Sequence, residues 1–395
     1  MNVLVVNAGS SSLKYQLITV ETREILAKGA CERIGLGEST FSNSMNGQKM
    51  ELTLPIPNHR TAISLVLGIL LKNETDGKPS NITIDAIGHR IVHGGSYFKD
   101  SCIVDDEVVR KIEEIAPLAP LHNYAAASVI ESCREVLPSI PNIVSFDTSF
   151  HATIPEVAWR YALPRDLCEQ LKLRKYGFHG INHRYVNMTV NELTGGKAHK
   201  IVSCHLGNGS SITSIKDGIA VDTTMGFTPL DGLVMGTRCG SIDPATVTYI
   251  IENTNLTAHE VDTIMNKKSG LLAVSGFTND IRDLIESTEA GHPQAKLALD
   301  MFCYSAKKYL GAMWAVMGGI DTVVFTAGAG QNSPYIRTKT LEGMEHLGFV
   351  IDEEKNQERH DEPWSIAAPE ATVNIFVIPA GEEFMIAYDV KRLLS

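Results

Sequence analysis

Residues 3–17 read VLVVNAGSSSLKYQL: four apolar residues open into an asparagine, a glycine and three serines, and strand-like alternation then resumes. Residues 201–215, IVSCHLGNGSSITSI, follow the same plan near the middle of the chain. Both stretches predict a buried strand, a tight turn and a second strand. Two domains of similar plan would explain this echo, although two unrelated Gly-Ser turns would produce it as well.

Strand and helix patterns alternate along the rest of the chain, which predicts an α/β fold. Buried strands are expected at Val3–Val6, Ala86–Val92, Asn142–Phe146, Ile201–Cys204, Thr322–Phe325 and Asn374–Ile378. Helices are expected at Ala62–Leu71, Glu107–Ile115, Ala125–Val136 and Gln294–Met317. In the last of these, Leu297, Met301, Tyr304 and Lys308 recur at helical spacing.

Composition narrows the class of protein. A chain of 395 residues exceeds what one core usually serves, so we expect two domains. The net charge is −11 with the basic residues spread out, which argues against nucleic acid as the main partner. Seven cysteines without a Cys-x-x-Cys pair fit a reducing cytoplasm. No basic leader is present and the apolar run Tyr309–Ile320 is too short to cross a bilayer, so no membrane is expected as a partner.

The Gly-Ser turns suggest phosphate binding. Neither is a P-loop, but a tight turn between paired strands presents backbone N–H groups and hydroxyls that suit phosphate oxygens. Asn7 offers a neutral oxygen to Mg²⁺ or its water shell, and Lys14 offers a point charge. A plain hairpin turn explains the same residues equally well. A third glycine loop, Gly328-x-Gly330, follows an apolar strand and allows close approach of a ligand to the backbone.

Two arginines and several acids lie where a ligand could meet them. Arg90 ends a strand before a Gly-Gly turn, and Arg238 stands in a glycine-punctuated loop. Arginine binds carboxylates and phosphates through two hydrogen bonds, although a surface ion pair is its commoner use. Asp147 follows a strand directly and could help hold a metal with Glu382 or Glu383. A turn aspartate and simple acids at a helix N-terminus are the alternatives.

Two histidine pairs, His89/His93 and His179/His183, have the spacing of zinc ligands on a helix. Glycines interrupt or flank both pairs, which argues against a helix and therefore against zinc. The better functional use of such a histidine is to donate a hydrogen bond to a developing phosphate charge.

Taken together, these residues resemble the acetate kinase family of the acetate and sugar kinase/Hsc70/actin superfamily. The motifs run through almost the whole chain: VLVVNAGSSSLKYQL, IGHRIVHGG, APLHN, FDTSFH, YGFHG, CHLGNGSS, MGFTPLDGLVMGTRCG, FTAGAGQNS and IPAGEEFMIA. The resemblance implies an α/β fold of two duplicated actin-like (ribonuclease H-like) domains flanking an active-site cleft. The first would span residues 1–147, completed by a C-terminal helix at 382–395. The second, at 148–381, would carry the nucleotide loops and the interface of a homodimer.

The activity implied by the resemblance is reversible transfer of the γ-phosphoryl group of ATP to acetate, giving acetyl phosphate and ADP. Mg²⁺ would be the metal, with Mn²⁺ able to replace it. The metal positions match Asn7 and Glu382, and nearby positions for nucleotide phosphates match Ser10, Ser12 and Lys14. The catalytic positions match Arg90 for the carboxylate, Asp147 as the active-site acid, and His179 with Arg238 for the transition state.

The resemblance also implies two binding sites. Nucleotide loops match His205, Leu206, Gly207, Asn208 and Gly209, then Asp280, Ile281 and Arg282, and finally Gly328, Ala329, Gly330, Gln331 and Asn332. A small apolar pocket for the acyl methyl group matches Val92, Leu121, Phe178 and Pro229. The acceptor carboxylate, with a pKa of about 4, is already ionised at neutral pH and has no proton to lose. Asp147 is therefore expected to orient a metal or an arginine rather than to act as a base.

The chain departs from the usual family pattern at several positions: Tyr124, Ile181-Asn182, Cys239, Ser241, Ala329, Gln331 and Ala380-Gly381. These departures leave acyl preference open, so a propionate kinase is the alternative within the family. A nucleotide sensor without turnover would have little reason to keep Arg90, Asp147, His179 and Arg238 together. A dinucleotide oxidoreductase is excluded because no strand leads into Gly-x-Gly-x-x-Gly with an acid about 20 residues further on.

Overall fold

The computed structural model describes residues 1–395 apart from 46, 72–73, 76–77, 80–82 and 121. The chain divides into two compact units, and each has its own sheet and core. Unit 1 comprises Met1–Phe150 and Gly381–Ser395, and unit 2 comprises His151–Ala380. The C-terminal segment therefore returns to the unit in which the chain begins.

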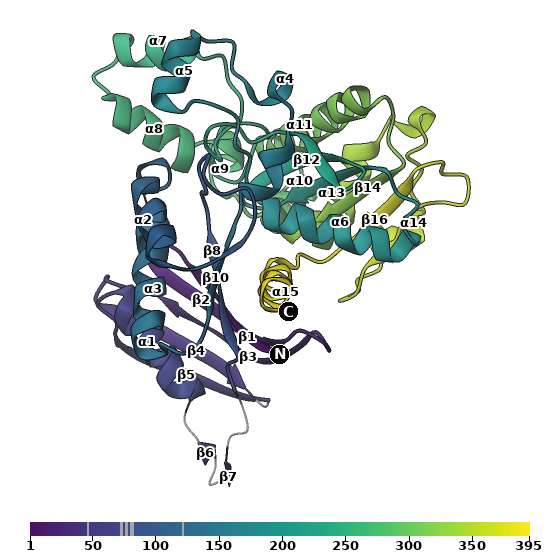
Figure 1. The fold of residues 1–395 in the computed structure, drawn as a ribbon. Helices are drawn as coiled ribbons and strands as arrows, with labels where there is room; N and C mark the ends of the chain where they lie inside the picture. The colour runs from purple at the N-terminus through teal and green to yellow at the C-terminus, as the bar shows by residue number, and fades with distance from the viewer. Residues whose placement is uncertain (46, 72–73, 76–77, 80–82, 121) are drawn as a thin grey trace. The chain divides into compact units, whose positions relative to one another are not determined.

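Unit 1 is built on a mixed sheet whose eight described strands run in the order β5-β4-β3-β2-β1-β8-β10-β9 (Figure 1). The strands are β1 (Asn2–Ala8), β2 (Ser12–Thr19), β3 (Glu24–Glu32), β4 (Glu38–Met45), β5 (Gln48–Pro55), β8 (Ala86–Ile91), β9 (Cys102–Ile103) and β10 (Asn142–Phe146). β1 pairs antiparallel with β2 and parallel with β8, and β8 pairs parallel with β10. A separate short ladder joins β6 (Glu74–Thr75) to β7 (Lys78–Pro79).

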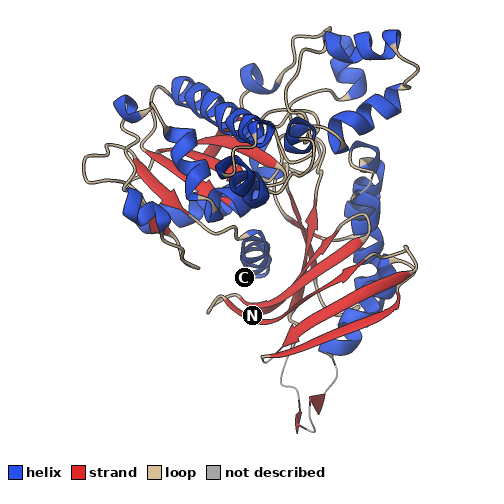
Figure 2. Ribbon diagram, turned by 180° about the vertical axis from the view of Figure 1, so that it is seen from behind, coloured by secondary structure: helices blue, strands red, loops and turns tan. Residues whose placement is uncertain are grey.

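Helices lie on both faces of this sheet (Figure 2). They are α1 (His59–Leu70), α2 (Asp106–Glu114), η1 (Ala116–Leu118), α3 (Asn123–Val136) and α15 (Glu382–Leu394), and η2 (Ser149–Thr153) follows at the boundary with unit 2. Alternate residues of β1 face opposite ways, so Leu4 and Val6 pack with α1 and α3 in one core. On the other face α15 packs close to Gly88, where a Cβ would lie 2.6 Å from Cγ2 of Ile386.

Unit 2 contains a six-stranded sheet, as far as the structure describes it, in the order β13-β12-β11-β14-β16-β15. The strands are β11 (Lys200–Leu206), β12 (Ser210–Lys216), β13 (Ile219–Thr223), β14 (Thr322–Thr326), β15 (Trp364–Ser365) and β16 (Asn374–Val377). β11 pairs antiparallel with β12 and parallel with β14, and β14 pairs parallel with β16. The order β13-β12-β11-β14-β16 therefore repeats β3-β2-β1-β8-β10 of unit 1, and the two Gly-Ser turns occupy equivalent places.

The helices of unit 2 include a layer on each face of its sheet. They are α4 (Glu156–Trp159), α5 (Arg165–Leu171), α6 (Gly180–Thr194), α7 (Ala245–Asn253), α8 (Ala258–Lys267), α9 (Gly270–Ser275), α10 (Ile281–Glu289), α11 (Pro293–Met317), α12 (Ala327–Asn332), α13 (Pro334–Leu341), η3 (Glu345–Leu347) and α14 (Glu353–Gln357). On β11, Val202 and Cys204 pack into the core that contains α11, while the side chains of Ser203 and His205 bond residues of α6.

The six predicted strands and four predicted helices are confirmed, with ends that differ by a few residues. Leu297, Met301 and Tyr304, which recur at helical spacing along α11, have exposed fractions of 52%, 39% and 70%. The face of α11 toward the sheet is formed instead by Leu299, Phe302 and other small or apolar residues. A helical period identifies a face but does not say whether that face is covered.

The predicted loop at Gly328-x-Gly330 is also different in the structure. Residues Ala327–Asn332 form the short helix α12 directly after β14, in place of an open glycine loop. The backbone N–H groups at its start remain free of intrahelical partners, as at any helix N-terminus, so the segment keeps the donors that a phosphate would need.

Candidate active site

The polar residues predicted in unit 1 lie together at the carboxyl ends of parallel strands. Asn7 on β1 is in register with Arg90 on β8 and with Lys14 on β2. Asp147 follows β10 directly, and its backbone N–H donates to the carbonyl of Ile91 at 2.9 Å. In open α/β sheets this edge is where ligands bind.

Arg90 and Asp147 form a bidentate ion pair. Nη2 of Arg90 donates to Oδ2 of Asp147 at 2.6 Å, and Nε donates to Oδ1 at 3.2 Å. Burial alone would lower the pKa of Arg90, but the charges of Asp147 and Glu382 outweigh it and hold that pKa above its usual value. Nη1 of Arg90 lies 3.8 Å from Oε2 of Glu382. The pairing with Asp147 uses one edge of the guanidinium, and Nη1 on the other edge faces the Glu382 carboxylate.

Glu382 and Glu383 are the first two residues of α15, as the helix N-terminal interpretation predicted. Burial raises the pKa of the Glu383 carboxyl, and the neighbouring charge of Glu382 raises it further. Among the described residues, no three His, Cys, Asp or Glu side chains are grouped so as to hold a metal ion by themselves. Oxygen donors from Asn7 and Glu382 nevertheless suit Mg²⁺, which keeps several waters and takes few protein ligands when a phosphate supplies the rest.

The first Gly-Ser turn is a tight connection between β1 and β2. The N–H of Gly9 donates to the carbonyl of Ser12 at 2.8 Å, and Nε2 of His59 lies 2.7 Å from the carbonyl oxygen of Gly9. Ser10 is exposed and Ser12 is partly buried. Phosphate binding by these two hydroxyls stays a prediction.

In unit 2, His179 stands immediately before α6 in a left-handed backbone conformation, with φ 58° and ψ 20°. Such a conformation is uncommon and costly for a residue with a side chain, and it is concentrated at functional sites. Because α6 starts at Gly180, His183 lies on a helix while His179 precedes it in the left-handed conformation, so the two histidines do not share a helix, as the glycine between them predicted. The first pair is not helical, since His89 lies on β8 and His93 in the loop that follows.

A chain of hydrogen bonds extends from His179 into the interior of unit 2. Nδ1 of His179 lies 2.9 Å from the hydroxyl of Ser211, and the same hydroxyl lies 2.8 Å from Nε2 of His183. Nδ1 of His183 lies 2.9 Å from the hydroxyl of Ser203. Burial holds the pKa of His183 well below its usual value, so this ring is neutral at physiological pH. The ring of His205 stacks on that of His179 with centroids 4.0 Å apart.

Arg238 lies beside His179 without an acidic partner. Its Nη1 donates to the carbonyl of Pro229 at 3.1 Å, and no carboxylate in the described parts of the chain pairs with it. A Cβ on Gly209 would lie 3.2 Å from Nη1 of Arg238 and 3.6 Å from Nε2 of His179, so the two side chains flank this glycine. Burial lowers the pKa of Arg238. A partly buried cation that no carboxylate neutralises is suited to an anionic ligand.

The predicted nucleotide segments of unit 2 line one cavity of about 1070 Å³. Gly207 and Asn208 come from the β11–β12 turn, Asp280–Arg282 from the start of α10, and Gly328, Ala329 and Asn332 from α12. Oδ1 of Asn208 accepts from Nδ2 of Asn279 at 2.8 Å, which ties two of these segments together. Leu206 does not line the cavity, because its side chain is buried in the core of unit 2.

Arg337 was missed by sequence reasoning, and it positions one wall of this cavity. It is fully buried on α13 and donates to the carbonyls of Gly330 and Gln331, which end α12, at 2.9 and 2.7 Å. It also donates to Oδ1 of Asn356 at 2.7 Å. Burial lowers the pKa of Arg337 to about 10. A buried arginine that binds carbonyls rather than an acid carries no signature in the local sequence.

Replacing Arg337 with methionine keeps most of the volume but leaves buried carbonyls unpaired. We expect the free energy of unfolding, measured in urea, to fall by about 3 kcal/mol, since each unsatisfied buried group costs roughly 1–3 kcal/mol. Arg359 is exposed in the same unit, so Arg359→Met is a matched control that should change stability by less than about 0.5 kcal/mol. Equal effects of the two changes would contradict the role given to Arg337.

The residues predicted for the acyl pocket come from both units. Val92 is half-buried after β8, Phe178 is buried and Pro229 is half-buried in unit 2, while Leu121 lies outside the described residues. An acyl pocket formed by these four residues stays a prediction. His89 and His93 are buried, and burial lowers the pKa of each to about 4, so both are neutral structural residues. Nε2 of His89, for example, lies 2.7 Å from Oδ1 of Asn142.

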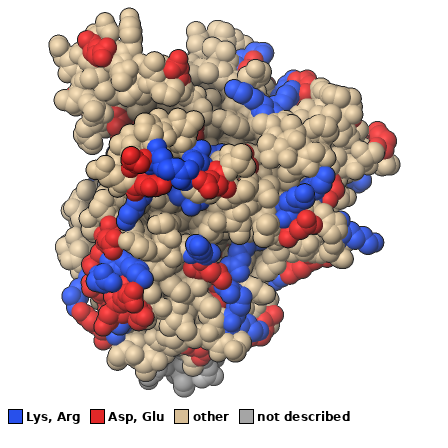
Figure 3. All heavy atoms as spheres, turned by 45° about the horizontal axis from the view of Figure 1, so that its top comes forward, with Lys and Arg blue, Asp and Glu red and all other residues tan. Residues whose placement is uncertain are grey.

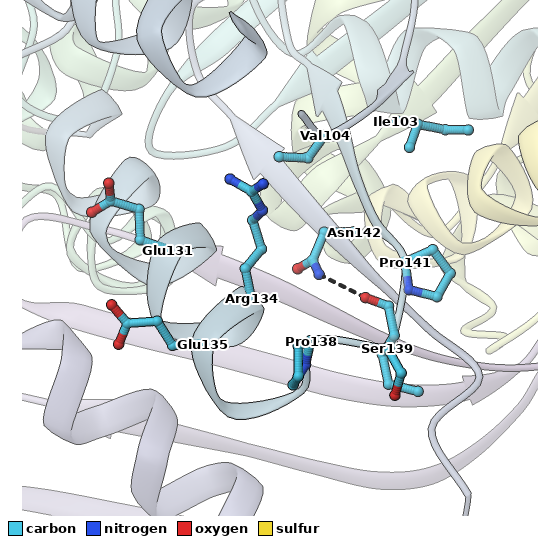
Figure 4. Close-up of a pocket in the computed structure, with 10 residues that line it drawn as sticks. Ile103, Val104, Glu131, Arg134, Glu135, Pro138, Ser139, Pro141 and Asn142 are labelled. Carbon is cyan, nitrogen blue, oxygen red and sulfur yellow. Dashed lines mark hydrogen bonds between the residues drawn. The ribbon is translucent and has the colours of Figure 1, made fainter. Parts of the chain in front are cut away.

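The surface charge and one further cavity add no residue to the candidate site. On the face shown in Figure 3, acidic and basic side chains are intermixed without a broad basic area. A cavity of about 640 Å³ in unit 1 contains no predicted site residue; it lies at the amino end of β10, where Asn142 donates to the carbonyl of Ile140 at 3.0 Å (Figure 4). Over the stretches that the structure describes, no helix has both the length and the apolar character needed to cross a membrane.

The repeated sheet order, with a Gly-Ser turn at the same place in each unit, defines an α/β protein built from two units of the same plan. The sequence model of the acetokinase family matches residues 2–388, so the chain belongs to that family. An acetate kinase of Caldanaerobacter subterraneus is 48% identical over 100% of this chain and 99% of its own length. The crystal structure of Porphyromonas gingivalis acetate kinase superposes with a TM-score of 0.94, at 41% identity and full coverage of both chains. A propionate kinase structure from Francisella tularensis superposes with a TM-score of 0.91, at 36% identity and 99% coverage of both chains.

Proposed function

We propose that this chain is an ATP:acetate phosphotransferase, which converts acetate and ATP to acetyl phosphate and ADP, and the reverse. The observation that carries this function is the anion site of unit 2. There Arg238, which has no carboxylate partner in the described residues, flanks Gly209 together with His179, next to a cavity lined by the predicted nucleotide segments. Family membership over the whole chain supports the same conclusion.

The side chains fit a transfer that needs positioning and charge neutralisation rather than a base. The acetate carboxylate is already ionised at neutral pH, so no proton has to be removed from it. Asp147 accepts two hydrogen bonds from Arg90 and so fixes the guanidinium, whose Nη1 would then bind the substrate carboxylate. Donors on His179 and Arg238 would stabilise charge that develops on the transferring phosphoryl group.

Mg²⁺ is part of this proposal. Asn7 and Glu382 would hold it, and their oxygen donors fit the metal. When bound, the metal would neutralise negative charge on the phosphate oxygens of the nucleotide, and Mn²⁺ is expected to replace it. Lys14, in register with Asn7, would contribute a further positive charge toward the phosphates.

Replacing Glu382 with alanine tests the metal assignment. We expect the Mg²⁺ concentration for half-maximal rate to rise tenfold or more, because one of few protein oxygens is lost. A Mg²⁺ titration at saturating ATP and acetate measures this. Glu383→Ala is the matched comparison, since Glu383 is the adjacent acid on α15. If only Glu383→Ala shifts the titration, the metal ligand has been assigned to the wrong glutamate.

Trapping of the acyl phosphate with hydroxylamine tests the reaction itself. Formate, acetate, propionate and butyrate would be compared side by side, each with ATP, GTP or pyrophosphate as the phosphoryl donor. The proposal expects the highest kcat/KM with acetate and ATP. A propionate preference would favour the second candidate, for which the likeness to the Francisella propionate kinase is the motivation. Discrimination by one methylene is worth only about 10–200-fold.

We further propose a cytoplasmic homodimer whose contacts lie on unit 2. α7 buries no side chain, although it carries Tyr249 and two isoleucines, and α11 exposes Leu297, Met301 and Tyr304. Exposed apolar helix faces of this kind are typical of protein interfaces. All seven cysteines are free, which fits a reducing compartment. Sedimentation equilibrium should give twice the chain mass of 43.1 kDa, and a monomer would contradict the dimer.

A further inference from the structure

The side chain of Asn182 faces His205 in the interior of unit 2. Asn182 is the third residue of α6, it is fully buried, and its Nδ2 lies 2.9 Å from Nδ1 of His205. The same Nδ2 lies 3.4 Å from the hydroxyl of Thr326, the residue in register with His205 on β14. An amide nitrogen can only donate, so Nδ1 of His205 must accept, and the proton of the neutral ring is on Nε2.

His205 lies close in sequence to residues that line the predicted nucleotide cavity, so its protonation state bears on nucleotide binding. It lies on β11, two residues before Gly207 and three before Asn208, which line the predicted nucleotide cavity. Its ring stacks on that of His179 with an interplanar angle of 14°. Two stacked imidazoles that both carried a positive charge would repel each other, which costs free energy. A donor on Asn182 that occupies Nδ1 therefore keeps His205 neutral while leaving Nε2–H as a donor.

We propose that Asn182 is a positioning residue that holds His205 in its neutral Nε2–H form, as a hydrogen-bond donor to a phosphate oxygen of the nucleotide. This inference rests on the proposed nucleotide-dependent function. Asn182 does not touch the substrate in this account; it acts through His205.

The isosteric change Asn182→Asp separates this role from mere packing. A carboxylate can only accept, so it calls for a proton on Nδ1 of His205. At low pH the ring of the variant carries both protons and keeps its Nε2–H donor. As the pH rises through the titration of His205, the ring loses the proton on Nε2 and retains the one paired with the introduced carboxylate, so the donor is lost.

The groups that face His205 determine which changes in the pH profile of KM can be assigned to this ring. His179 stacks on the ring, His183 lies with its centroid 6.1 Å away, and Arg238 flanks Gly209 together with His179. Burial holds the pKa of His183 below its usual value, so this ring is neutral in the wild type. Thr326 and Asn182 are the uncharged neighbours on β14 and α6. Because residue 182 faces Nδ1 of His205 directly, His205 is the ring on which the introduced carboxylate acts first.

We expect KM for ATP in Asn182→Asp to rise roughly tenfold to hundredfold as the pH is raised, with near wild-type KM at the acid end. The wild type should lack this step. Asn191→Asp makes the same chemical change further along α6, where the amide donates to Asn187, and should leave the pH profile of KM unchanged. A profile of Asn182→Asp parallel to that of the wild type would overturn the proposal.

A measurement without turnover keeps this inference separate from the proposed reaction. Long-range ¹H–¹⁵N spectra of ¹⁵N-histidine protein distinguish the two tautomers, and His205→Gln identifies the His205 signals. We expect an unprotonated Nδ1 in the wild type and a protonated Nδ1 in Asn182→Asp, with MgADP perturbing the Nε2 signal of the wild type. A proton on Nδ1 in the wild type would overturn the proposal, even if the chain phosphorylates acetate. The expected tautomer and MgADP response in a chain that fails to phosphorylate acetate would leave it standing.

Discussion

Replacing Arg238 with alanine is expected to lower kcat by roughly 10²–10³-fold, the cost of removing one donor to a developing anion. The expectation follows from the position of the side chain. Arg238 is partly buried, bonds the carbonyl of Pro229 and has no carboxylate partner among the described residues, so its charge is available to a ligand. Because the interaction is strongest in the transition state, KM for ATP and acetate should change much less than kcat.

The conservative variant sharpens this test. Arg238→Lys keeps a positive charge but loses the planar fork, so it should recover only a small part of the lost rate. Arg165 on α5 is exposed in the same unit, and Arg165→Ala should leave kcat unchanged. Steady-state kinetics at saturating Mg²⁺ measure all three proteins. A kcat within fivefold of the wild type in Arg238→Ala would refute the role of Arg238 in phosphoryl transfer.

Much of the fold could be predicted because its signals are local. Val3–Val6 and Ile201–Cys204 are short apolar runs followed closely by glycine and serine, and each forms the first strand of a repeated core. The same apolar patterns predicted that Arg90 and Asp147 lie at the ends of strands. Motifs of this kind place a residue at the end of a strand, and the fold then brings the strand ends together.

Other features depend on contacts that no local pattern records. Whether the helical repeat of α11 is covered depends on which face meets the sheet, and Leu299 and Phe302 occupy that face rather than Met301. Arg337 binds the end of α12 and Asn356, and Asn182 binds His205 across more than 20 residues of sequence. The same limit explains why the glycines of α12 were expected in a loop: glycine weakens a helix, but packing against β11 and β14 overrides that preference here.

The pairing of Arg90 with Asp147 leads to the second prediction with a large expected effect. Asp147 is 1% exposed, and both of its oxygens accept from Arg90. Arg90→Ala should therefore do two things. It should lower kcat/KM for acetate by a hundredfold or more, because the proposed carboxylate ligand is gone. It should also lower the free energy of unfolding by about 3–5 kcal/mol, because a buried carboxylate loses its partner.

A double-mutant cycle separates these effects. Asp147→Asn removes the charge that Arg90 neutralises, so the double variant should be more stable than Arg90→Ala alone, with a coupling of roughly 1–3 kcal/mol. Urea unfolding measures the stabilities, and kinetics at low temperature keep the weakest variant folded. If Asp147 orients Arg90, Asp147→Asn should raise KM for acetate and leave a rate that does not vary with pH near neutrality. If Asp147 were instead an obligatory base, Asp147→Asn would abolish turnover while acetate binding survived. Additive losses of stability would show that the ion pair does not hold these strand ends together.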